Sequence, residues 1–375
     1  MRYYGGLDLL RFFSATLVVL FHISTFGAIA PSWPVDSSSA PLGWLAPVGW
    51  LGWIGVQLFF VLSGFIISAS AENSTVSAFL KRRAIRVFPA LWLSAALALA
   101  VRAAWGEPLA SLFPSFLRAI VLSPKGPYID GVVWSLIVEA VFYIFIAGAI
   151  CVASKWGGMG RCLTISAFAI GTASTAFTIL NWMAVKTAVF ASDGALAPSL
   201  GWFGFDVLLL RHGVFFAVGM LLYQTITRDL SKTMSMGLAV FGAACCLQIL
   251  TSVHGGHSSA APVVIWVVAT GVACASAKYG EKANSQKLRR FLRPVGLMTY
   301  PLYLNHFVLG QALMPLFAPW MPNRVGLFLA LFGTLLANAA FIALVPERWL
   351  QRRARNLLLQ PPLPRPQTRI RAVTD

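Results

Sequence analysis

The sequence predicts an all-α polytopic membrane protein with about ten transmembrane helices and both termini in the cytoplasm. The composition is 58% hydrophobic and only 11% charged, whereas a soluble globular domain carries about 25% charged residues. Apolar runs long enough to cross the roughly 30 Å hydrocarbon core as helices recur along the chain. Lys and Arg gather in short segments between alternate runs, which is the pattern of cytoplasmic loops.

Hydropathy divides the chain into spans separated by polar or proline-rich loops. The expected spans cover residues 7–30, 48–70, 89–105, 131–153, 162–182, 204–225, 234–252, 260–277, 297–318 and 325–345. We assign the net charge of +17 to this topology and not to nucleic-acid binding, because the basic residues lie in the loops of one side. Residues 1–350 form one transmembrane domain, and we expect 351–375 to be a basic, proline-rich cytoplasmic tail without stable structure.

The cysteines indicate neither a disulfide framework nor a metal site. Their number is odd, none belongs to a CxxC motif, and all five fall in or beside apolar runs. Free cysteine in such surroundings behaves as a small hydrophobic side chain. We therefore expect buried thiols, and no bound metal.

The first span carries three residues that are costly in lipid. Asp8, Arg11 and His22 follow steps of three and four residues, so they share one stripe of the helix. A charge at mid-membrane costs at least about 2.5–3.5 kcal/mol, so this stripe should face protein or water. His22 lies about 21 Å along the helix from Asp8. It is either a functional titratable group or a hydrogen-bonded interhelical histidine.

The second span contains Gly55, Ser63 and Gly64 among large apolar residues. Small residues allow two membrane helices to approach closely. We interpret these three positions as packing positions rather than as parts of a site.

The segment before the third span is basic. Arg83 and Arg86 are three residues apart, so they share a helix face, and Pro89 lies where we expect the next span to begin. Two guanidiniums at the cytoplasmic surface can bind a phosphate group bidentately. The alternative is a topology signal that also attracts anionic lipid.

The fourth span carries a carboxylate inside an apolar helix. Ser135, Glu139 and Tyr143 are spaced by four and lie along one stripe. Glu139 lies about 12 Å from the outer edge of its span, and this depth agrees with that of His22. A histidine and a glutamate that meet there would form a base with its orienting acid. The alternative is a structural ion pair.

The ninth span presents Tyr300, Tyr303 and His306 on one face, because their spacing is three. Arg211 and His212 lie in the sixth span near mid-depth or the outer interface. We assign no role to the two histidines of the glycine-rich outer loop that follows the seventh span.

Taken in order, these stretches resemble the membrane-bound acyltransferase-3 family, whose members O-acylate sugars and related acceptors. The matching residues are Arg2, Leu7, Asp8, Leu10, Arg11 and His22; Gly55, Val56, Leu58, Phe59, Phe60, Leu62, Ser63, Gly64 and Phe65; Arg82, Arg83, Arg86 and Pro89; Trp134, Ser135, Leu136, Glu139, Phe142 and Tyr143; and Tyr300, Leu302, Tyr303, Leu304 and His306. The chain departs from the family pattern at Thr299-Tyr300-Pro301, where Ser-Tyr-Ser or a similar sequence is usual.

The resemblance implies a ten-helix bundle in the inner (cytoplasmic) membrane of a bacterium. Such a bundle takes an acyl group, most often acetyl, from acyl-coenzyme A at the cytoplasmic face. The acceptor is commonly a hydroxyl group of a cell-envelope or secreted glycan. The expected partners are therefore acyl-coenzyme A, a hydroxyl acceptor and membrane lipids, with no tightly bound cofactor.

The resemblance also implies roles for individual residues. His22 is the expected catalytic base and Glu139 a catalytic or orienting acid. Residues expected to bind the coenzyme A donor or to line its path are Arg11, Arg83, Arg86, Tyr300, Tyr303 and His306. Residues expected to bind substrate are Trp134, Ser135 and Tyr143.

Two alternatives remain open from the sequence. Intramembrane His, Glu and Arg residues also mark proton relays and substrate pathways, so a transporter is an alternative to an enzyme. Within the enzyme class, the acceptor is either a glycan or a small-molecule or lipid-linked hydroxyl compound.

Overall fold

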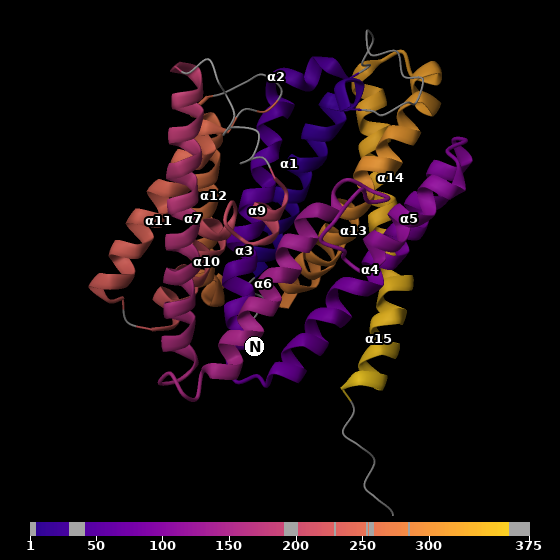
Figure 1. Ribbon diagram of the computed structural model, residues 1–375. Coiled ribbons are helices and arrows are strands. Elements are labelled where there is room, and N and C mark those ends of the chain that lie inside the picture. Colours follow the sequence, from indigo (N-terminus) through magenta and orange to yellow (C-terminus); the bar gives the residue numbers. More distant parts are fainter. Residues whose placement is uncertain are drawn as a thin grey trace, which may run out of the picture.

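A computed structural model describes residues 5–29, 42–190, 202–228, 230–252, 254, 259–283 and 286–359. All regular elements within these ranges are helices, and most of them run along one common direction (Figure 1). The all-α, polytopic membrane architecture predicted from the sequence is confirmed.

Each predicted span overlaps one long helix of the bundle, but the sixth is broken, because a turn at 208–212 separates α9 (Gly204–Val207) from α10 (Gly213–Thr227) and holds Arg211 and His212. The long helices are α1 (Gly5–Ile29), α3 (Ile54–Ala71), α4 (Val76–Ala104), α6 (Val133–Val152), α7 (Met159–Phe190), α10 (Gly213–Thr227), α11 (Lys232–Thr251), α12 (Ala261–Ala283), α13 (Gln286–Phe317) and α14 (Arg324–Leu344). In the described residues, 8 helical stretches are long and apolar enough to cross a membrane. The two that are not among them are α10, which has 15 residues, and α13. A total of ten spans and the side of the termini stay predictions.

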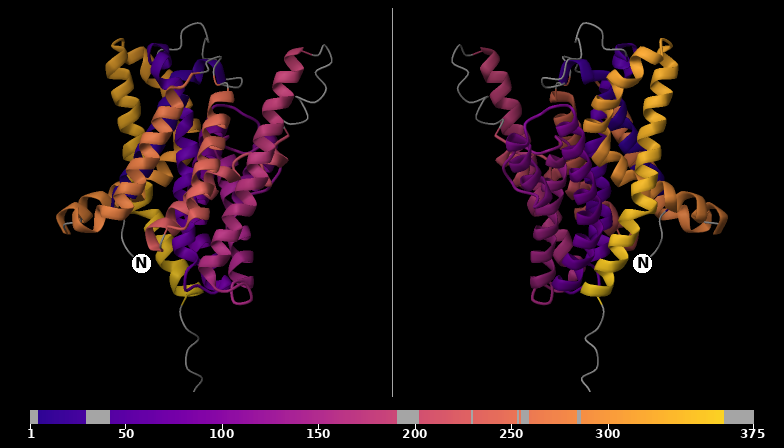
Figure 2. Two further views of the ribbon diagram at one scale, coloured as in Figure 1. Left: turned by 90° about the vertical axis from the view of Figure 1, so that its left-hand side faces the viewer. Right: turned by 90° about the vertical axis from the view of Figure 1, so that its right-hand side faces the viewer.

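Short elements connect the long helices. They are η2 (Gly43–Leu45), α2 (Ala46–Gly49) and η3 (Trp50–Trp53) before α3, α5 (Leu109–Ile120) after α4, α9 (Gly204–Val207) before α10, η4 (Ala318–Trp320) after α13, and α15 (Pro346–Leu358) after α14. The C-terminal end of α12 and the N-terminal end of α13 project sideways from the bundle (Figure 2).

Two expectations about helix boundaries are corrected. Helix α4 is continuous from Val76 to Ala104, so Pro89 lies inside it and does not begin a new helix. The basic segment and the third span are therefore one rigid element. Helix α15 continues to Leu358, so residues 351–358 of the expected unstructured tail are helical, and the remainder from 360 on lies outside the described residues.

Glycines bring α3 and α10 into backbone contact. A Cβ atom added to Gly64 would lie 2.2 Å from the carbonyl oxygen of Phe216, and one added to Gly219 would lie 2.0 Å from that of Val61. Gly55 packs in the same way against α1, because its Cβ would lie 2.3 Å from the carbonyl oxygen of Ser14. The packing role predicted for Gly55 and Gly64 is confirmed.

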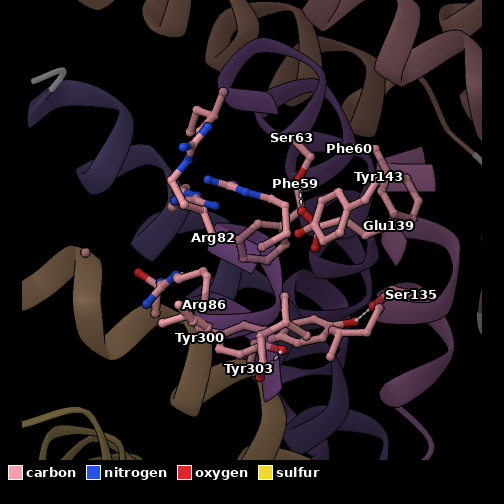
Figure 3. Close-up of a pocket in the computed structure, with 18 of the residues that line it drawn as sticks. Phe59, Phe60, Ser63, Arg82, Arg86, Ser135, Glu139, Tyr143, Tyr300 and Tyr303 are labelled. Atoms are coloured by element: carbon pink, nitrogen blue, oxygen red, sulfur yellow. Dashed lines mark hydrogen bonds between the residues drawn. The ribbon is translucent and has the colours of Figure 1, made fainter. Parts of the chain in front are cut away.

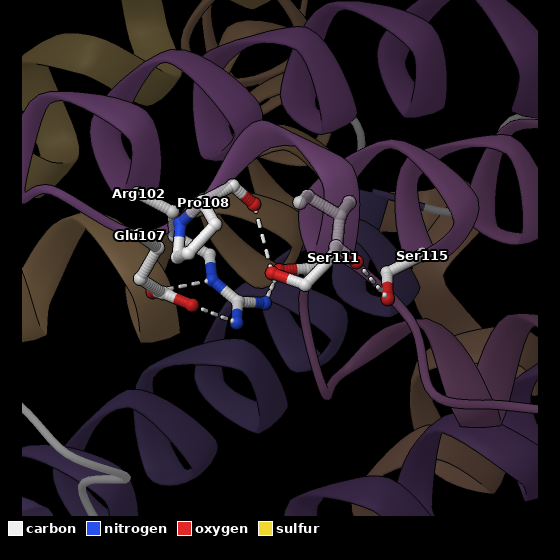
Figure 4. Close-up of polar contacts among 6 residues, drawn as sticks. Arg102, Glu107, Pro108, Ser111 and Ser115 are labelled. Carbon is white, nitrogen blue, oxygen red and sulfur yellow. Dashed lines mark hydrogen bonds and ion pairs between the residues drawn. The ribbon is translucent and has the colours of Figure 1, made fainter.

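A guanidinium fixes the corner between α4 and α6 (Figure 4). Arg102 donates to both carboxylate oxygens of Glu107, at 2.8 and 2.6 Å, and to the carbonyl oxygen of Ile129 at 2.9 Å. Inside this corner the hydroxyl of Ser111 donates to the carbonyl oxygen of Pro108. Together these bonds hold the segment that leads into α6.

We predict that Gly64→Ala destabilises the protein, whereas Gly333→Ala does not. Overpacking costs about 1–3 kcal/mol, and the added methyl group at Gly64 would meet backbone. Alanine regains up to about 1 kcal/mol of helix propensity at either position, and a Cβ on Gly333 meets nothing within 4 Å. The melting temperature of detergent-purified protein should fall by about 1–3 °C for Gly64→Ala only. Equal melting temperatures for the two variants would contradict the close approach of α3 and α10.

Candidate functional site

A cavity of about 530 Å³, which we call the arginine cavity, is lined by residues of the first turns of α4 and the last turns of α15, among others. These two helix ends lie at the lower end of the bundle in Figure 1. Its lining includes the guanidinium side chains of Arg11, Arg82, Arg83, Arg86 and Arg355. Glu139 is the carboxylate among the lining residues (Figure 3). The excess of positive charge suits an anionic ligand.

The guanidiniums of α4 are held by neighbours but keep hydrogen-bonding capacity. Arg83 donates to the hydroxyl of Ser70 at 3.2 Å, and its buried Nε has no partner among the described residues. Arg86 donates to Glu347 of α15 at 3.3 Å and lies over the ring of Tyr300, 5.6 Å from its centroid. Both arginines named from the sequence therefore face one cavity, with donors left for a ligand.

Glu139 lies in the arginine cavity. It accepts a hydrogen bond from the hydroxyl of Ser63 at 2.6 Å, and the ring of Tyr143 lies beside it (Figure 3). Ser63, assigned only to packing from the sequence, therefore also orients the carboxylate.

Tyr303 separates the arginine cavity from a second one. Its hydroxyl hydrogen-bonds the hydroxyl of Ser135 at 2.7 Å and donates to the carbonyl oxygen of Val132 at 3.4 Å (Figure 3). Tyr303 and Val56 line both cavities. The two cavities therefore meet at this tyrosine.

The second cavity, of about 470 Å³, is lined by His22, His212 and His254, and we call it the histidine cavity. Trp134, expected to bind substrate, also lines it. His22 and Glu139 thus line different cavities, and the expected dyad of these two residues is corrected. Equal depth along two helices did not determine which way each side chain turns.

The partner of His22 is His306. Nδ1 of His306 lies 2.7 Å from the carbonyl oxygen of Tyr303, and Nε2 of His306 lies 2.8 Å from Nδ1 of His22. A carbonyl oxygen only accepts, so neutral His306 carries its proton on Nδ1 and accepts through Nε2. His22 must then donate from Nδ1, which leaves its Nε2 unprotonated. His306 therefore orients a basic nitrogen of His22 in the way predicted for Glu139.

Several residues of the two cavities were not assigned to a site from the sequence. They are Arg82, Gln351 and Arg355 in the arginine cavity, and Trp53, Gln57 and His254 in the histidine cavity. The four-residue spacing of Gln351 and Arg355 is a helical signal, but the segment was expected to lack structure. The loop histidine gave no signal, because nothing in its local sequence connects it to Trp53, on which it stacks.

Asp130 links the segment before α6 to α13 near His306. Its side chain is buried, and its two oxygens accept from the backbone N–H groups of Val132 at 3.1 Å and Val308 at 3.3 Å. Burial raises the pKa of Asp130 from 3.8 to about 7. This carboxyl group therefore titrates near neutral pH.

Comparison with known proteins identifies similar chains. Residues 4–343 match the family model described as "Acyltransferase domain". The chain is 26% identical to "Nodulation protein 10" of Rhizobium leguminosarum bv. viciae over 195 residues, which is 45% of this chain and 50% of that protein. It is 29% identical to "Exopolysaccharide production protein ExoZ" of Rhizobium meliloti (strain 1021) over 121 residues, 28% of this chain and 36% of that protein. The chain thus spans half or less of each relative's length, and it matches no solved structure.

We predict that the stability of the protein falls as the pH rises toward 7, through Asp130. Its folded-state pKa of about 7 lies above the unfolded value, so the folded protein holds a proton that the unfolded chain releases at about pH 4. This stabilisation is complete below about pH 4 and is lost by about pH 7. The melting temperature of wild type relative to Asp130→Asn should therefore fall between about pH 5 and 7 and level off above. Parallel curves for the two proteins would contradict the assignment.

Proposed function

The chain belongs to the acyltransferase-3 family, and from that premise we propose that it is a membrane O-acyltransferase. It moves an acyl group, acetyl in the simplest case, from acyl-coenzyme A to a hydroxyl group of a cell-envelope or secreted glycan. The observation that carries this proposal is the meeting of an arginine-lined and a histidine-lined cavity at Tyr303.

The arginine cavity suits the donor. Coenzyme A carries several phosphate charges, and guanidinium groups bind phosphate through charge-assisted hydrogen bonds. The cavity volume of about 530 Å³ lies within the usual range for small-molecule sites. With the phosphates near α4 and α15, the long pantetheine arm carries the thioester toward Ser135 and Tyr303.

The histidine cavity suits the acceptor, because His22 lines it and the hydrogen bond to His306 puts the proton of the neutral His22 ring on Nδ1 rather than on Nε2. In the proposed reaction this nitrogen takes the proton of the acceptor hydroxyl while the hydroxyl oxygen attacks the thioester carbonyl. The new carbon–oxygen bond makes the ester, and the carbon–sulfur bond breaks. The proton passes from His22 to the departing thiolate, which leaves as free coenzyme A.

The proposed location is the cytoplasmic membrane of a bacterium, with the arginine cavity open to the cytoplasm. Both relatives come from bacteria, and the name of one refers to exopolysaccharide production, which supports a glycan acceptor. A small-molecule or lipid-linked acceptor is the second candidate within the same reaction. A transporter is less supported, because the matched family is an acyltransferase domain.

The first experiment measures coenzyme A release by the purified chain in nanodiscs, supplied with acetyl-coenzyme A and a crude envelope-glycan extract. Release should require the extract. His22→Ala should lower the rate by about 10²–10⁴-fold, because a positioned base contributes that factor, while acetyl-coenzyme A binding stays unchanged. His306→Gln, which keeps an acceptor for His22, should lose less. Transfer by His22→Ala at the wild-type rate would remove it from the role of base.

Two arginines of α15 test the donor site as a matched pair. Arg355 lines the arginine cavity, whereas Arg353, also exposed, lies over Trp349 at 5.3 Å from the ring centroid. Losing one charged contact to a phosphate should raise the KM for acetyl-coenzyme A by about tenfold or less in Arg355→Ala. Arg353→Ala should leave this KM unchanged. The same KM for both variants would argue against phosphate binding at this helix.

A further inference from the structure

The histidine cavity contains a set of buried polar atoms that lack hydrogen-bond partners among the described residues. They are Trp53 Nε1, Gln57 Oε1, His212 Nδ1 and His254 Nδ1, and all four residues line this one cavity. Trp53, Gln57 and His212 are each more than nine-tenths buried. A buried polar atom without a partner costs free energy, so a cluster of them indicates a ligand that supplies the missing bonds.

The contact of His212 with Asp206 determines which ring nitrogen of His212 can accept a hydrogen bond from a ligand. Nε2 of His212 lies 3.0 Å from a carboxylate oxygen of Asp206. A carboxylate only accepts, so the neutral imidazole carries its proton on Nε2 and leaves Nδ1 as an acceptor. Gln57 Oε1 is a second acceptor, while the indole Nε1–H of Trp53 is a donor. A hydroxyl group can both donate and accept, so neighbouring hydroxyls of one ligand match this set.

The cavity is close to electrically neutral. Nε of Arg211 lies 2.9 Å from Asp206, so the charge of the guanidinium is balanced. Burial lowers the pKa of His254 from 6.5 to about 4, so this loop histidine is neutral near pH 7. The arginine cavity, in contrast, is strongly positive. The two cavities therefore select ligands of different charge.

Aromatic rings supply flat apolar walls. His254 stacks on Trp53 with ring centroids 4.0 Å apart and an interplanar angle of 12°, and Trp134 lies at 5.5 Å from His212. A sugar ring has apolar C–H faces and a polar hydroxylated edge. Flat rings together with scattered donors and acceptors match both parts of such a ligand.

We propose that the histidine cavity binds the acyl acceptor as a neutral polyhydroxylated ring. His22 deprotonates one hydroxyl of this ring, and His212 Nδ1 and Gln57 Oε1 accept hydrogen bonds from the neighbouring hydroxyls. This inference rests on the proposed acyltransferase function. Asp206 acts as a positioning residue, because it sets the tautomer of His212. Acidic sugars are poor substrates, because binding them would bury an unpaired charge. Simple alcohols are also poor substrates, because they leave the hydrogen-bond acceptors of the cavity without a partner.

The test uses the full chain in nanodiscs with acetyl-coenzyme A and defined acceptors. The probes are the methyl glycosides of glucose, galactose and mannose, the methyl glycoside of glucuronic acid, and 1-propanol; the crude envelope-glycan extract is a further arm. The readouts are kcat and KM for each acceptor from thiol release, with acetyl-coenzyme A binding measured separately. At least one neutral glycoside should give saturable transfer that the uronate and 1-propanol do not.

Asp206→Asn and Gln57→Leu should each raise the KM for that glycoside by about tenfold, the loss of one hydrogen bond, and leave acetyl-coenzyme A binding unchanged. The asparagine amide can donate to Nε2 of His212, which moves the imidazole proton to Nδ1 and converts an acceptor into a donor. Glu107→Gln is the matched control, because it breaks the Arg102–carboxylate contact in the corner between α4 and α6 (Figure 4). Its KM for the acceptor should equal that of wild type.

The outcomes separate this inference from the function on which it rests. Two results overturn the inference if the extract still supports thiol release: no transfer to any neutral glycoside, or an unchanged KM for the glycoside in both variants. In either case the proposed acyltransferase function stands. Equal transfer to the uronate overturns the neutral class. Absence of release with every acceptor overturns the proposed function itself. If Asp206→Asn loses donor binding through misfolding, Gln57→Leu decides the result.

Discussion

The cost of placing charged and polar side chains in hydrocarbon determines the arrangement of this bundle. Helices α1, α4, α6 and α13 each carry ionisable or polar residues at membrane depth, and each turns them toward the interior. They gather in two cavities that meet at one tyrosine. Large apolar side chains such as Ile144, Val264 and Leu329 are exposed on the outside of the bundle.

The two cavities differ in the chemistry that their residues offer. Guanidiniums from three helices surround one cavity, and α15 contributes to it from the far end of the sequence. Histidines, aromatic rings and side-chain amides surround the other. Tyr303 belongs to both, so an anionic ligand on one side and a neutral ligand on the other would approach each other at its hydroxyl group. A two-substrate transfer needs such a junction.

Hydrogen-bond direction assigns the roles of the histidines without any carboxylate beside His22. The carbonyl oxygen of Tyr303 fixes the tautomer of His306, which in turn fixes that of His22. Asp206 does the same for His212. Two histidines with a defined neutral tautomer thus line one cavity. A backbone carbonyl sets the tautomer of His22 through His306, and a carboxylate sets that of His212.

The sequence by itself determined the all-α membrane class, the position of each long helix and the polar stripes on α1, α6 and α13, because these depend on composition and on the helical period. It also identified His22 and Glu139 as ionisable residues inside apolar helices, and Arg83 and Arg86 as a basic pair on one helix face. Only the tertiary structure decided which of them meet. Glu139 turned toward the arginines, and His306 toward His22. The rotation and packing of a helix depend on contacts such as Gly64 against Phe216, between residues far apart in the chain, and the period within one helix carries no information about them.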